Sequence, residues 1–437
     1  MLPVVGQGLS VPVVGDGTEV RGVNLDCAAT TPALVAVAER IARVLPYYGS
    51  VHRGAGLPAR VSTALYEHAR TAIGRFAGAR PDDEVVITRN TTDALNLLAG
   101  CVPDDAGDVL VLDVEHHANL LPWRRRPHRQ VPIRETVDAT VAALEAALVA
   151  RPAALLTVTG ATNVTGEVLP LEEITELARA HGARVAIDAA QLAPHRRFSL
   201  AALGADYVAF SGHKLYAPYG AGALVGRRDW LDAGEPYLAG GGAVREVLPD
   251  AVAWAEGPAR HEGGTPNLLG AVALAEACAT LDGLPAGALE RHEAALRTRL
   301  LDGLAEIEGI EVVCLWPDTL EAIGVVAFTV AHFPPGLVSA VLAAEHGVGV
   351  RDGRFCAHQL LARLGLPDGA VRASFGVAST SDDIDRLVTA LDALVQRGPS
   401  HTYAREDGTW TPAPDDRRLP AWLGDAAMSP SPCALPA

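Results

Sequence analysis

The chain has 437 residues, a formal net charge of −16 and 49% hydrophobic residues, which is the composition of a soluble globular protein. A chain this acidic is poorly suited to the phosphate backbone, so we expect no nucleic-acid partner. No apolar run of roughly 18 residues occurs, so no membrane span is expected. Residues 1–15 lack the basic start of a signal peptide, so none is predicted.

Cysteine usage indicates the compartment. The six cysteines are scattered at positions 27, 101, 278, 314, 356 and 433, and no Cys-x-x-Cys pair occurs. This spacing predicts neither a zinc site nor a disulfide framework, so we expect no metal. A reducing, cytoplasmic location fits these scattered cysteines best.

Strands and helices alternate through the first two thirds of the chain. Short apolar runs predict strands at 84–88, 109–114, 153–159, 185–187 and 207–210, and helical spacing predicts helices at 62–77, from 93 onwards and at 171–181. This alternation is typical of an α/β fold with a mostly parallel sheet flanked by helices. Because each strand ends in polar residues, polar groups should gather at one edge of the sheet.

The predicted domains follow from changes in this pattern. Residues 1–21, rich in Gly, Val and Pro, should form an irregular N-terminal arm, and a helix should begin at Thr31-Pro32. Residues 22–285 should form the large domain, with its N-terminal segment contributing to a small domain. Residues 286–398 should form that smaller C-terminal α+β domain. Residues 399–437 form a Pro-, Ser- and Asp-rich tail, expected to be loosely ordered or to wrap the surface.

Two strand ends carry the strongest chemical signal. Asp188 and Gln191 follow one strand, and Ser211, His213 and Lys214 follow another. A lysine can form a Schiff base with a pyridine aldehyde, and a carboxylate can keep the ring nitrogen protonated. Taken singly, these would be a surface lysine and a helix-capping aspartate. Together, at the ends of two strands, they predict a site for such a cofactor.

At this point the sequence resembles a known family. Asp188-Ala-Ala-Gln191 followed by Ser211-Gly-His-Lys214 is similar to the class V, fold type I enzymes that use pyridoxal 5'-phosphate (PLP). It most resembles their cysteine desulfurase and selenocysteine lyase group, over roughly residues 22–398. The resemblance implies PLP as cofactor, with Asp188, Gln191, Ser211, His213 and Lys214 as contacts.

The segment Arg89-Asn90-Thr91-Thr92 leads from a predicted strand into a helix. Free N–H groups and the helix dipole attract an anion there, although a threonine pair at a helix start is common. The resemblance makes Thr91 and Thr92 the phosphate loop. It also implies that Thr265, in Gly-Thr-Pro-Asn, contacts the phosphate bound by a neighbouring subunit, so that the protein would be an obligate homodimer.

Glu115-His116-His117 follows another strand. Adjacent residues on an extended chain point apart and no third ligand has useful spacing, so metal binding is not favoured. The resemblance implies instead that His116 stacks on the cofactor ring and moves protons. It places Asn163 at the cofactor ring and the substrate carboxylate. The remaining substrate contacts that it implies are His52, Arg351 and Arg372.

The segment Arg351-Asp352-Gly353-Arg354-Phe355-Cys356-Ala357 fits the family pattern Arg-x-Gly-x-x-Cys-Ala. It departs from the most similar group, in which two histidines often stand where this chain has Arg354 and Phe355. A desulfurase needs a thiolate that attacks the substrate sulfur and becomes a persulfide, and the flanking arginines would favour the thiolate. The ordinary alternative is a cysteine buried in the small domain.

Together these features predict a PLP-dependent cysteine desulfurase. Lys214, Cys356 and His116 would be catalytic, L-cysteine or selenocysteine would become L-alanine, and a sulfur-acceptor protein would be a partner. One alternative is a C–S lyase, epimerase or aminotransferase of the same class, with Cys356 a bystander. Another is a degenerate fold that serves as a scaffold.

Overall fold

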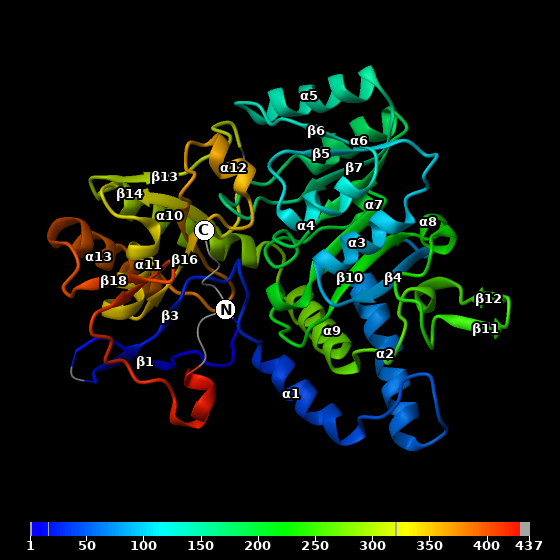
Figure 1. Cartoon of the computed structure of the whole chain (residues 1–437), viewed down its shortest axis with the longest axis horizontal. Helices are drawn as coiled ribbons and strands as arrows, with labels where there is room; N and C mark the ends of the chain where they lie inside the picture. Colours follow the sequence, from blue (N-terminus) through cyan, green and yellow to red (C-terminus); the bar gives the residue numbers. More distant parts are fainter. Residues whose placement is uncertain (1, 16, 320, 429–437) are drawn as a thin grey trace.

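The computed structural model describes residues 2–15, 17–319 and 321–428 (Figure 1). Within these residues, a seven-stranded sheet has the order β4-β10-β9-β8-β7-β5-β6. Its strands are β4 (Asp83–Thr88), β5 (Asp108–Leu112), β6 (His128–Val131), β7 (Ala153–Thr159), β8 (Arg184–Asp188), β9 (Tyr207–Ser211) and β10 (Gly222–Arg227). β10 is antiparallel to both neighbours, and the other pairs are parallel. Apart from β10, the strands therefore end at one edge of the sheet.

This sheet is buried on both faces because alternate side chains of its strands enter two cores. Leu110 and Leu112 of β5 pack into one core, whereas Val109 and Val111 pack into the other. The first core also receives α1 (Val35–Val44), α2 (Leu57–Phe76), α5 (Val137–Ala150), α6 (Leu171–Ala180), α7 (Leu200–Leu203) and α9 (Leu268–Asp282). The second receives α3 (Thr91–Cys101), α4 (His117–Leu120) and α8 (Arg228–Ala233).

A second, antiparallel sheet has the order β13-β14-β17-β16. Its strands are β13 (Ile310–Val312), β14 (Val325–Val330), β16 (Arg351–Gly353) and β17 (Ala370–Ser374). It shares a separate core with α10 (Ala288–Ala305), α11 (Pro335–His346) and α13 (Ser381–Arg397). The short helix α12 (His358–Arg363) follows β16. The expected fold class, a mostly parallel sheet with helices plus a smaller α+β part, is confirmed.

An N-terminal segment joins the core of the antiparallel sheet. β3 (Val23–Asn24) pairs in parallel with β15 (Val348–Gly349), and Val23 and Leu25 lie in the core that this sheet shares with α10, α11 and α13. The segment therefore crosses from the second sheet to α1 of the large sheet, as expected for an N-terminal contribution to the small domain. The boundary at residues 285 and 286 stays a prediction, although it falls between α9 and α10.

Both ends of the chain are more regular than expected. In the arm, β1 (Ser10–Pro12) and β2 (Glu19–Arg21) form an antiparallel hairpin, and the Val14 N–H donates to Ala344 O at 2.8 Å. In the tail, β18 (Tyr403–Glu406) and β19 (Thr409–Pro412) form a second hairpin. The Tyr403 hydroxyl donates to Glu345 of α11 at 3.1 Å. These contacts to the second domain explain the order of residues 403–412, which lie against the surface rather than being loosely ordered. Residues 429–437 lie outside the described part.

Two helices begin at other residues than the sequence predicted. α1 begins at Val35, since the Thr31 hydroxyl donates to His213 O and accepts from Tyr216 N–H. α3 begins at Thr91, because the Asn90 side chain caps it. In the described part of the chain, no helix combines the length and the apolar character needed to cross a membrane.

Candidate active site

Lys214 is the only lysine of the chain, and it lies directly after β9 in the short turn η3 (Gly212–Lys214). Asp188 ends the neighbouring strand β8 and pairs in register with Ala209 of β9. Both side chains therefore start from the same edge of the sheet. Burial lowers the pKa of Lys214 to about 8, Asp188 opposes this change, and the charge of Arg372 adds to it. The amine therefore loses its proton far more easily than an ordinary lysine, although the protonated form still predominates at neutral pH.

Asp188 is a buried carboxylate with little to balance its charge. Its side chain is 3% exposed, and Oδ1 accepts one hydrogen bond, from the Ala190 N–H at 2.9 Å. Burial raises its pKa, although the Ala190 N–H and the charge of Lys214 act in the opposite direction. A protonated pyridine nitrogen beside Asp188 would supply the missing cation.

Gln191, one turn beyond β8, has an unpaired acceptor. Its Nε2 atom donates to Ala28 O at 2.8 Å, whereas its buried Oε1 atom has no hydrogen-bond partner among the described residues. Leaving a buried acceptor unpaired costs about 1–3 kcal/mol. A ligand with a hydroxyl donor at this place would remove that cost.

Hydroxyl groups gather where the N-terminus of α3 meets the end of β9. The Thr91 N–H donates to Ser211 Oγ at 2.7 Å, and Thr91 Oγ1 lies 2.7 Å from the same oxygen. Thr92 is exposed in the same first turn. The helix dipole and the hydroxyls at this N-terminus are well suited to a phosphate group, although the Thr91 N–H is already used by Ser211. The structure therefore brings Thr91, Thr92 and Ser211 together at this end of the sheet.

His213 is held beside Lys214 by two threonines. Its carbonyl accepts hydrogen bonds from Thr30 Oγ1 at 3.0 Å and Thr31 Oγ1 at 3.1 Å, and its Nδ1 atom lies 3.3 Å from Thr30 Oγ1. Burial lowers the pKa of His213, and the charge of Lys214 lowers it further. The neutral imidazole is therefore favoured next to the lysine. Its predicted contact with the cofactor stays a prediction.

His116 follows β5 and caps α4. The Ala118 N–H donates to His116 Nδ1 at 3.0 Å, which assigns the proton of the neutral ring to Nε2. Burial lowers the pKa of His116 to about 3, and the charges of Lys214, His117 and Arg372 lower it further. A ring that stays neutral can stack on an aromatic cofactor and exchange a proton at Nε2.

Arg372 of β17 supplies a buried guanidinium from the second sheet. Nη1 donates to Asn163 O at 2.7 Å, and Nη2 reaches Asp26 Oδ1 at 3.4 Å. Nε is buried without a partner among the described residues, and burial lowers the pKa of Arg372. A guanidinium with unused in-plane donors is suited to a carboxylate. Arg351 pairs with Arg372 across β16 and β17, but it is exposed.

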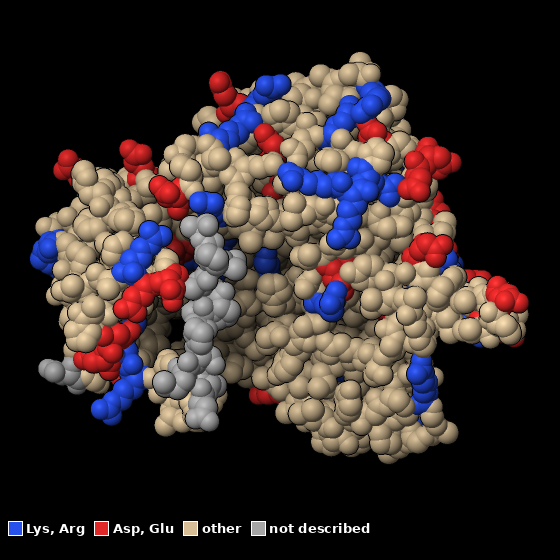
Figure 2. Space-filling model, viewed as in Figure 1, with Lys and Arg blue, Asp and Glu red and all other residues tan. Residues whose placement is uncertain are grey.

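Cys356 lies in a four-residue loop, residues 354–357, between β16 and α12; we call it the Cys356 loop. The thiol is exposed, which is unlike a cysteine that packs a core. The His117 N–H donates to Cys356 O at 3.0 Å. A negative charge on Cys356 raises the pKa of both Lys214 and Arg372, so the thiol lies within electrostatic reach of both. Figure 2 shows a hollow between the two domains, with Lys or Arg atoms, drawn in blue, inside it.

Two predicted site residues are not brought to this cluster within one chain. His52 Nε2 lies 2.8 Å from Glu67 Oε1, on the loop before α2. Thr265 is exposed on the loop before α9. Neither forms a hydrogen bond or an ion pair with the site residues above in the described part of the chain. Their roles at the substrate and at a neighbouring phosphate stay predictions.

Sequence reasoning missed two acidic partners. Asp26 contacts Arg372 from the segment Leu25-Asp26-Cys27-Ala28-Ala29. Glu115 was weighed only as a metal ligand. It is 1% exposed and accepts from Asn119 Nδ2 at 2.7 Å and the Thr159 N–H at 2.8 Å. Burial raises its pKa to about 8.

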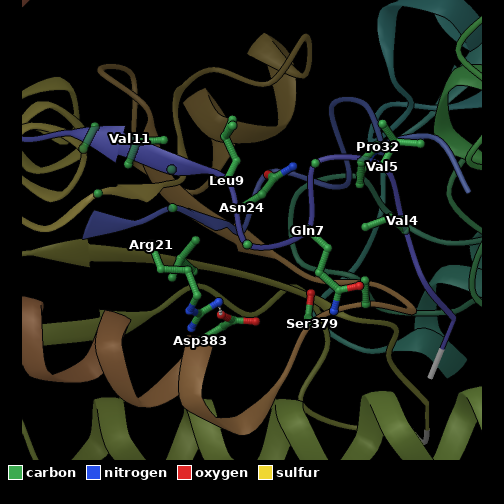
Figure 3. A pocket seen from close by; sticks show the side chains of 18 of the residues that line it. Val4, Val5, Gln7, Leu9, Val11, Arg21, Asn24, Pro32, Ser379 and Asp383 are labelled. Carbon is green, nitrogen blue, oxygen red and sulfur yellow. Dashed lines mark ion pairs between the residues drawn. The ribbon is translucent and has the colours of Figure 1, made fainter. Parts of the chain in front are cut away.

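Other hollows and clusters do not compete with this site. A cavity of about 900 Å³ lies between the N-terminal arm, α13 and the tail, and Arg21 pairs with Asp383 at 2.8 Å on its wall (Figure 3). None of the predicted site residues lines it. Across residues 2–15, 17–319 and 321–428, no group of three or more His, Cys, Asp or Glu side chains is placed to hold a metal ion.

Comparison with known proteins identifies the family. The model of the Aminotransferase class-V family matches residues 23–387. The chain is 35% identical over 384 residues to a probable cysteine desulfurase of Vibrio cholerae, covering 85% of this chain and 93% of that protein. It is 36% identical over 382 residues to a cysteine desulfurase of Dickeya dadantii, covering 85% and 91%.

Solved structures agree in fold. The cysteine desulfurase CsdA (S-sulfonic acid) of Escherichia coli superposes with a TM-score of 0.77 and 33% identity, covering 86% of this chain and 95% of that one. The apo cysteine desulfurase of Thermococcus onnurineus NA1 gives a TM-score of 0.78 and 32% identity, with the same coverage. With the strand-end lysine and aspartate in place, this chain belongs to the aminotransferase class-V family.

Proposed function

We propose that this chain is a PLP-dependent cysteine desulfurase, which converts L-cysteine or selenocysteine to L-alanine and takes up the sulfur or selenium on Cys356. One observation carries the proposal. The exposed Cys356 thiol lies on a loop of the second domain, and the Cys356 carbonyl of that loop accepts a hydrogen bond from the His117 N–H, in the segment that follows β5. The family match and the cysteine desulfurases among the relatives support it.

The residues at the strand ends fit PLP. Lys214 would hold its aldehyde, Asp188 its ring nitrogen and Gln191 its ring hydroxyl, which answers the unpaired Oε1 atom. The hydroxyl groups of Thr91, Thr92 and Ser211 at the start of α3 would hold its phosphate. His213, beside Lys214, would be a further contact of the cofactor. When bound, PLP supplies an electron sink for the charge that develops at the substrate α carbon.

The protein's own groups divide the remaining work. Arg372 binds the substrate carboxylate through its unused Nε and Nη donors, and Asn163 limits how that guanidinium can turn. Lys214, whose pKa is lowered to about 8, takes the α proton as a neutral amine. His116 stays neutral because its pKa is lowered to about 3, so its Nε2 proton is available for exchange.

The sulfur step needs no outside oxidant. The Cys356 thiolate attacks the substrate Sγ atom, a new S–S bond forms, and the substrate Cβ–Sγ bond breaks. The electron pair of the broken bond goes to Cβ, which gains a proton and becomes the methyl group of alanine. Cysteine and one thiol thus give alanine and one persulfide, with atoms and electrons in balance. A thiol reductant or a sulfur-acceptor protein then takes the sulfur.

The assembly and the location belong to the same proposal. We propose a homodimer, in which Thr265 contacts the phosphate of the neighbouring subunit. The hairpin of β11 (Val244–Leu248) and β12 (Ala251–Trp254) projects from the large domain (Figure 1). Its Val247 and Val252 side chains are 64% and 44% exposed, which favours burial against a second copy. Light scattering should give twice the chain mass, and Val247→Glu should weaken that species. Free cysteines favour a cytoplasmic location.

Product analysis tests the function. The PLP-loaded protein is incubated with L-cysteine and a thiol reductant, and alanine, sulfide, pyruvate and ammonia are measured. The proposal expects alanine and sulfide in equal amounts. Pyruvate with ammonia would indicate β-elimination instead, and turnover of neither kind would refute a cysteine-directed enzyme.

A further inference from the structure

The Cys356 loop has an unfavourable backbone at its centre. Phe355 has φ 51° and Cys356 has φ 54°, so two successive residues with Cβ atoms adopt the left-handed region. Residues other than glycine rarely do so, and two in succession persist only where the surroundings hold them. Contacts around these two residues must therefore keep the thiol in place.

Two hydrogen bonds hold the loop at these residues. Asn163 Nδ2 donates to Phe355 O at 2.7 Å, and the His117 N–H donates to Cys356 O at 3.0 Å. Both donors belong to segments that follow strands of the large sheet, β7 and β5. The carbonyl groups of the two residues with positive φ thus link this loop of the second domain to the large domain.

The third contact is made by the ring of Phe355. The Arg372 guanidinium carbon lies 4.9 Å from the ring centroid, which is a cation–π arrangement. Both side chains are buried, at 9% exposed for Phe355 and 3% for Arg372. Because little water screens this pair, the attraction is stronger than at a surface. Phe355 also stands at one of the two positions where the group that the sequence most resembles often has a histidine.

The arrangement leaves Arg372 free to bind a second partner. The guanidinium carbon lies over the Phe355 ring, whereas a carboxylate binds through the N–H donors of the guanidinium. Nη1 is already used by Asn163 O, and Nε is unpaired among the described residues. One arginine can thus hold the substrate through its N–H donors and the Cys356 loop through its contact with the ring.

We propose that Phe355 is a positioning residue, which latches the Cys356 loop to Arg372 through its aromatic ring and so limits the movement of the exposed thiol. The role of Cys356 as sulfur carrier rests on the proposed function, but the latch itself does not. A carboxylate that pairs with Arg372 reduces the positive charge facing the ring. Substrate binding should therefore loosen the latch at the moment when the thiol has to move.

Alkylation of the thiol measures the latch without turnover. The PLP-loaded protein is treated with iodoacetamide, and modification of Cys356 and Cys314 is followed by peptide mass spectrometry. Cys314 is the other exposed cysteine in the described residues and serves as the reference in the same molecule. Phe355→Leu, which keeps an apolar side chain but removes the ring, should react about tenfold faster at Cys356. Phe355→Tyr, which keeps the ring, should stay within about twofold of wild type.

A double-mutant cycle identifies the partner. Arg372→Lys keeps the charge but loses the planar guanidinium, and should also speed the alkylation of Cys356. If ring and guanidinium act together, Phe355→Leu with Arg372→Lys reacts no faster than the faster single variant. Equal Cys356 rates in wild type and Phe355→Leu, or rates that multiply in the double variant, would overturn the latch. Loss of the alanine product with an intact alkylation pattern would instead refute the function and leave the latch standing.

Discussion

The two halves of the candidate site are built in opposite ways. The half at the large sheet consists of side chains on buried strand ends, where Asp188 is 3% exposed and the pKa of Lys214 is lowered to about 8. The half from the second domain is an exposed thiol on a short loop with two left-handed residues. Proton transfer at a cofactor needs dry surroundings that do not move, whereas a sulfur carrier has to reach solvent to pass on its cargo.

The two halves also differ in how the surrounding protein acts on their functional groups. Around Lys214 the protein changes the pKa values of several groups, including Asp188, His116 and Arg372, and burial is the first cause of each change. Around Cys356 the structure offers few contacts: Asn163 and His117 reach its loop from the large domain, and Arg372 from the second sheet. Changes at the first half should therefore remove chemistry altogether, whereas changes at the second should remove only the sulfur step.

The largest effect is expected at the buried half. Lys214→Ala should lower the rate of alanine formation by about 10⁴-fold or more, because the proton acceptor is lost. Borohydride treatment of the PLP-loaded wild type should attach the cofactor to the Lys214 peptide, since no other lysine exists. Peptide mass spectrometry checks this. Cofactor attached to another residue, or turnover that survives the substitution, would contradict the role of Lys214.

The next effect should show the independence of the exposed half. Cys356→Ala should lower alanine formation from L-cysteine by about 10³-fold, since the sulfur has no acceptor. The visible absorbance of bound PLP should not change, because the buried half is intact. Cys314→Ala, the matched change at the other exposed cysteine of the described residues, should keep normal turnover. A Cys356→Ala enzyme that still releases sulfide at the wild-type rate would make this cysteine a bystander.

A smaller effect should locate the substrate carboxylate. Arg372→Lys should raise KM for L-cysteine about 10- to 100-fold, since a bidentate contact becomes a single one. Arg351→Lys on the neighbouring strand should change KM by no more than about threefold, because that side chain is exposed and a point charge is enough there. Steady-state kinetics checks both variants. The opposite order of effects would move the carboxylate to Arg351.

The smallest effect is a pH dependence. The neutral amine of Lys214 captures PLP, and its pKa is lowered to about 8, so the neutral fraction rises as the pH increases through about 8. The rate of PLP uptake by the cofactor-free protein should therefore rise between pH 7 and pH 9 and level off above that, about 1 unit beyond the pKa. Stopped-flow absorbance measures it. A rate still rising in proportion at pH 10 would mean that the lysine is not desolvated.

Local sequence pattern predicted the fold well wherever strands were short, apolar and followed by polar residues. Strand ends at Asp188 and Ser211 were recognisable because a buried parallel strand has no polar residues until it ends. β10 was missed, since its glycines obscured the apolar run Gly222-Ala-Leu-Val-Gly-Arg227. The N-terminal and tail hairpins were missed because they depend on contacts with residues more than 300 and more than 50 positions away, such as Val14 with Ala344 and Tyr403 with Glu345.

The same distinction between local pattern and distant contacts applies to the site residues. The positions of Lys214, Asp188 and Thr91 could be predicted because each stands at or just after the end of an apolar strand. The contact between Phe355 and Arg372 could not, because it joins a loop to a strand through side chains, with no local pattern to reveal it. Thr265 and His52 stay predictions, since the described single chain does not bring them to the cluster.

The central claim is that sulfur leaves the substrate onto Cys356. The most direct test is a single turnover of L-cysteine by the PLP-loaded enzyme without any reductant, with alanine and the mass of the Cys356 peptide measured together. The account predicts one alanine for each Cys356 that gains one sulfur atom. Alanine formed while the Cys356 peptide keeps its original mass would contradict it.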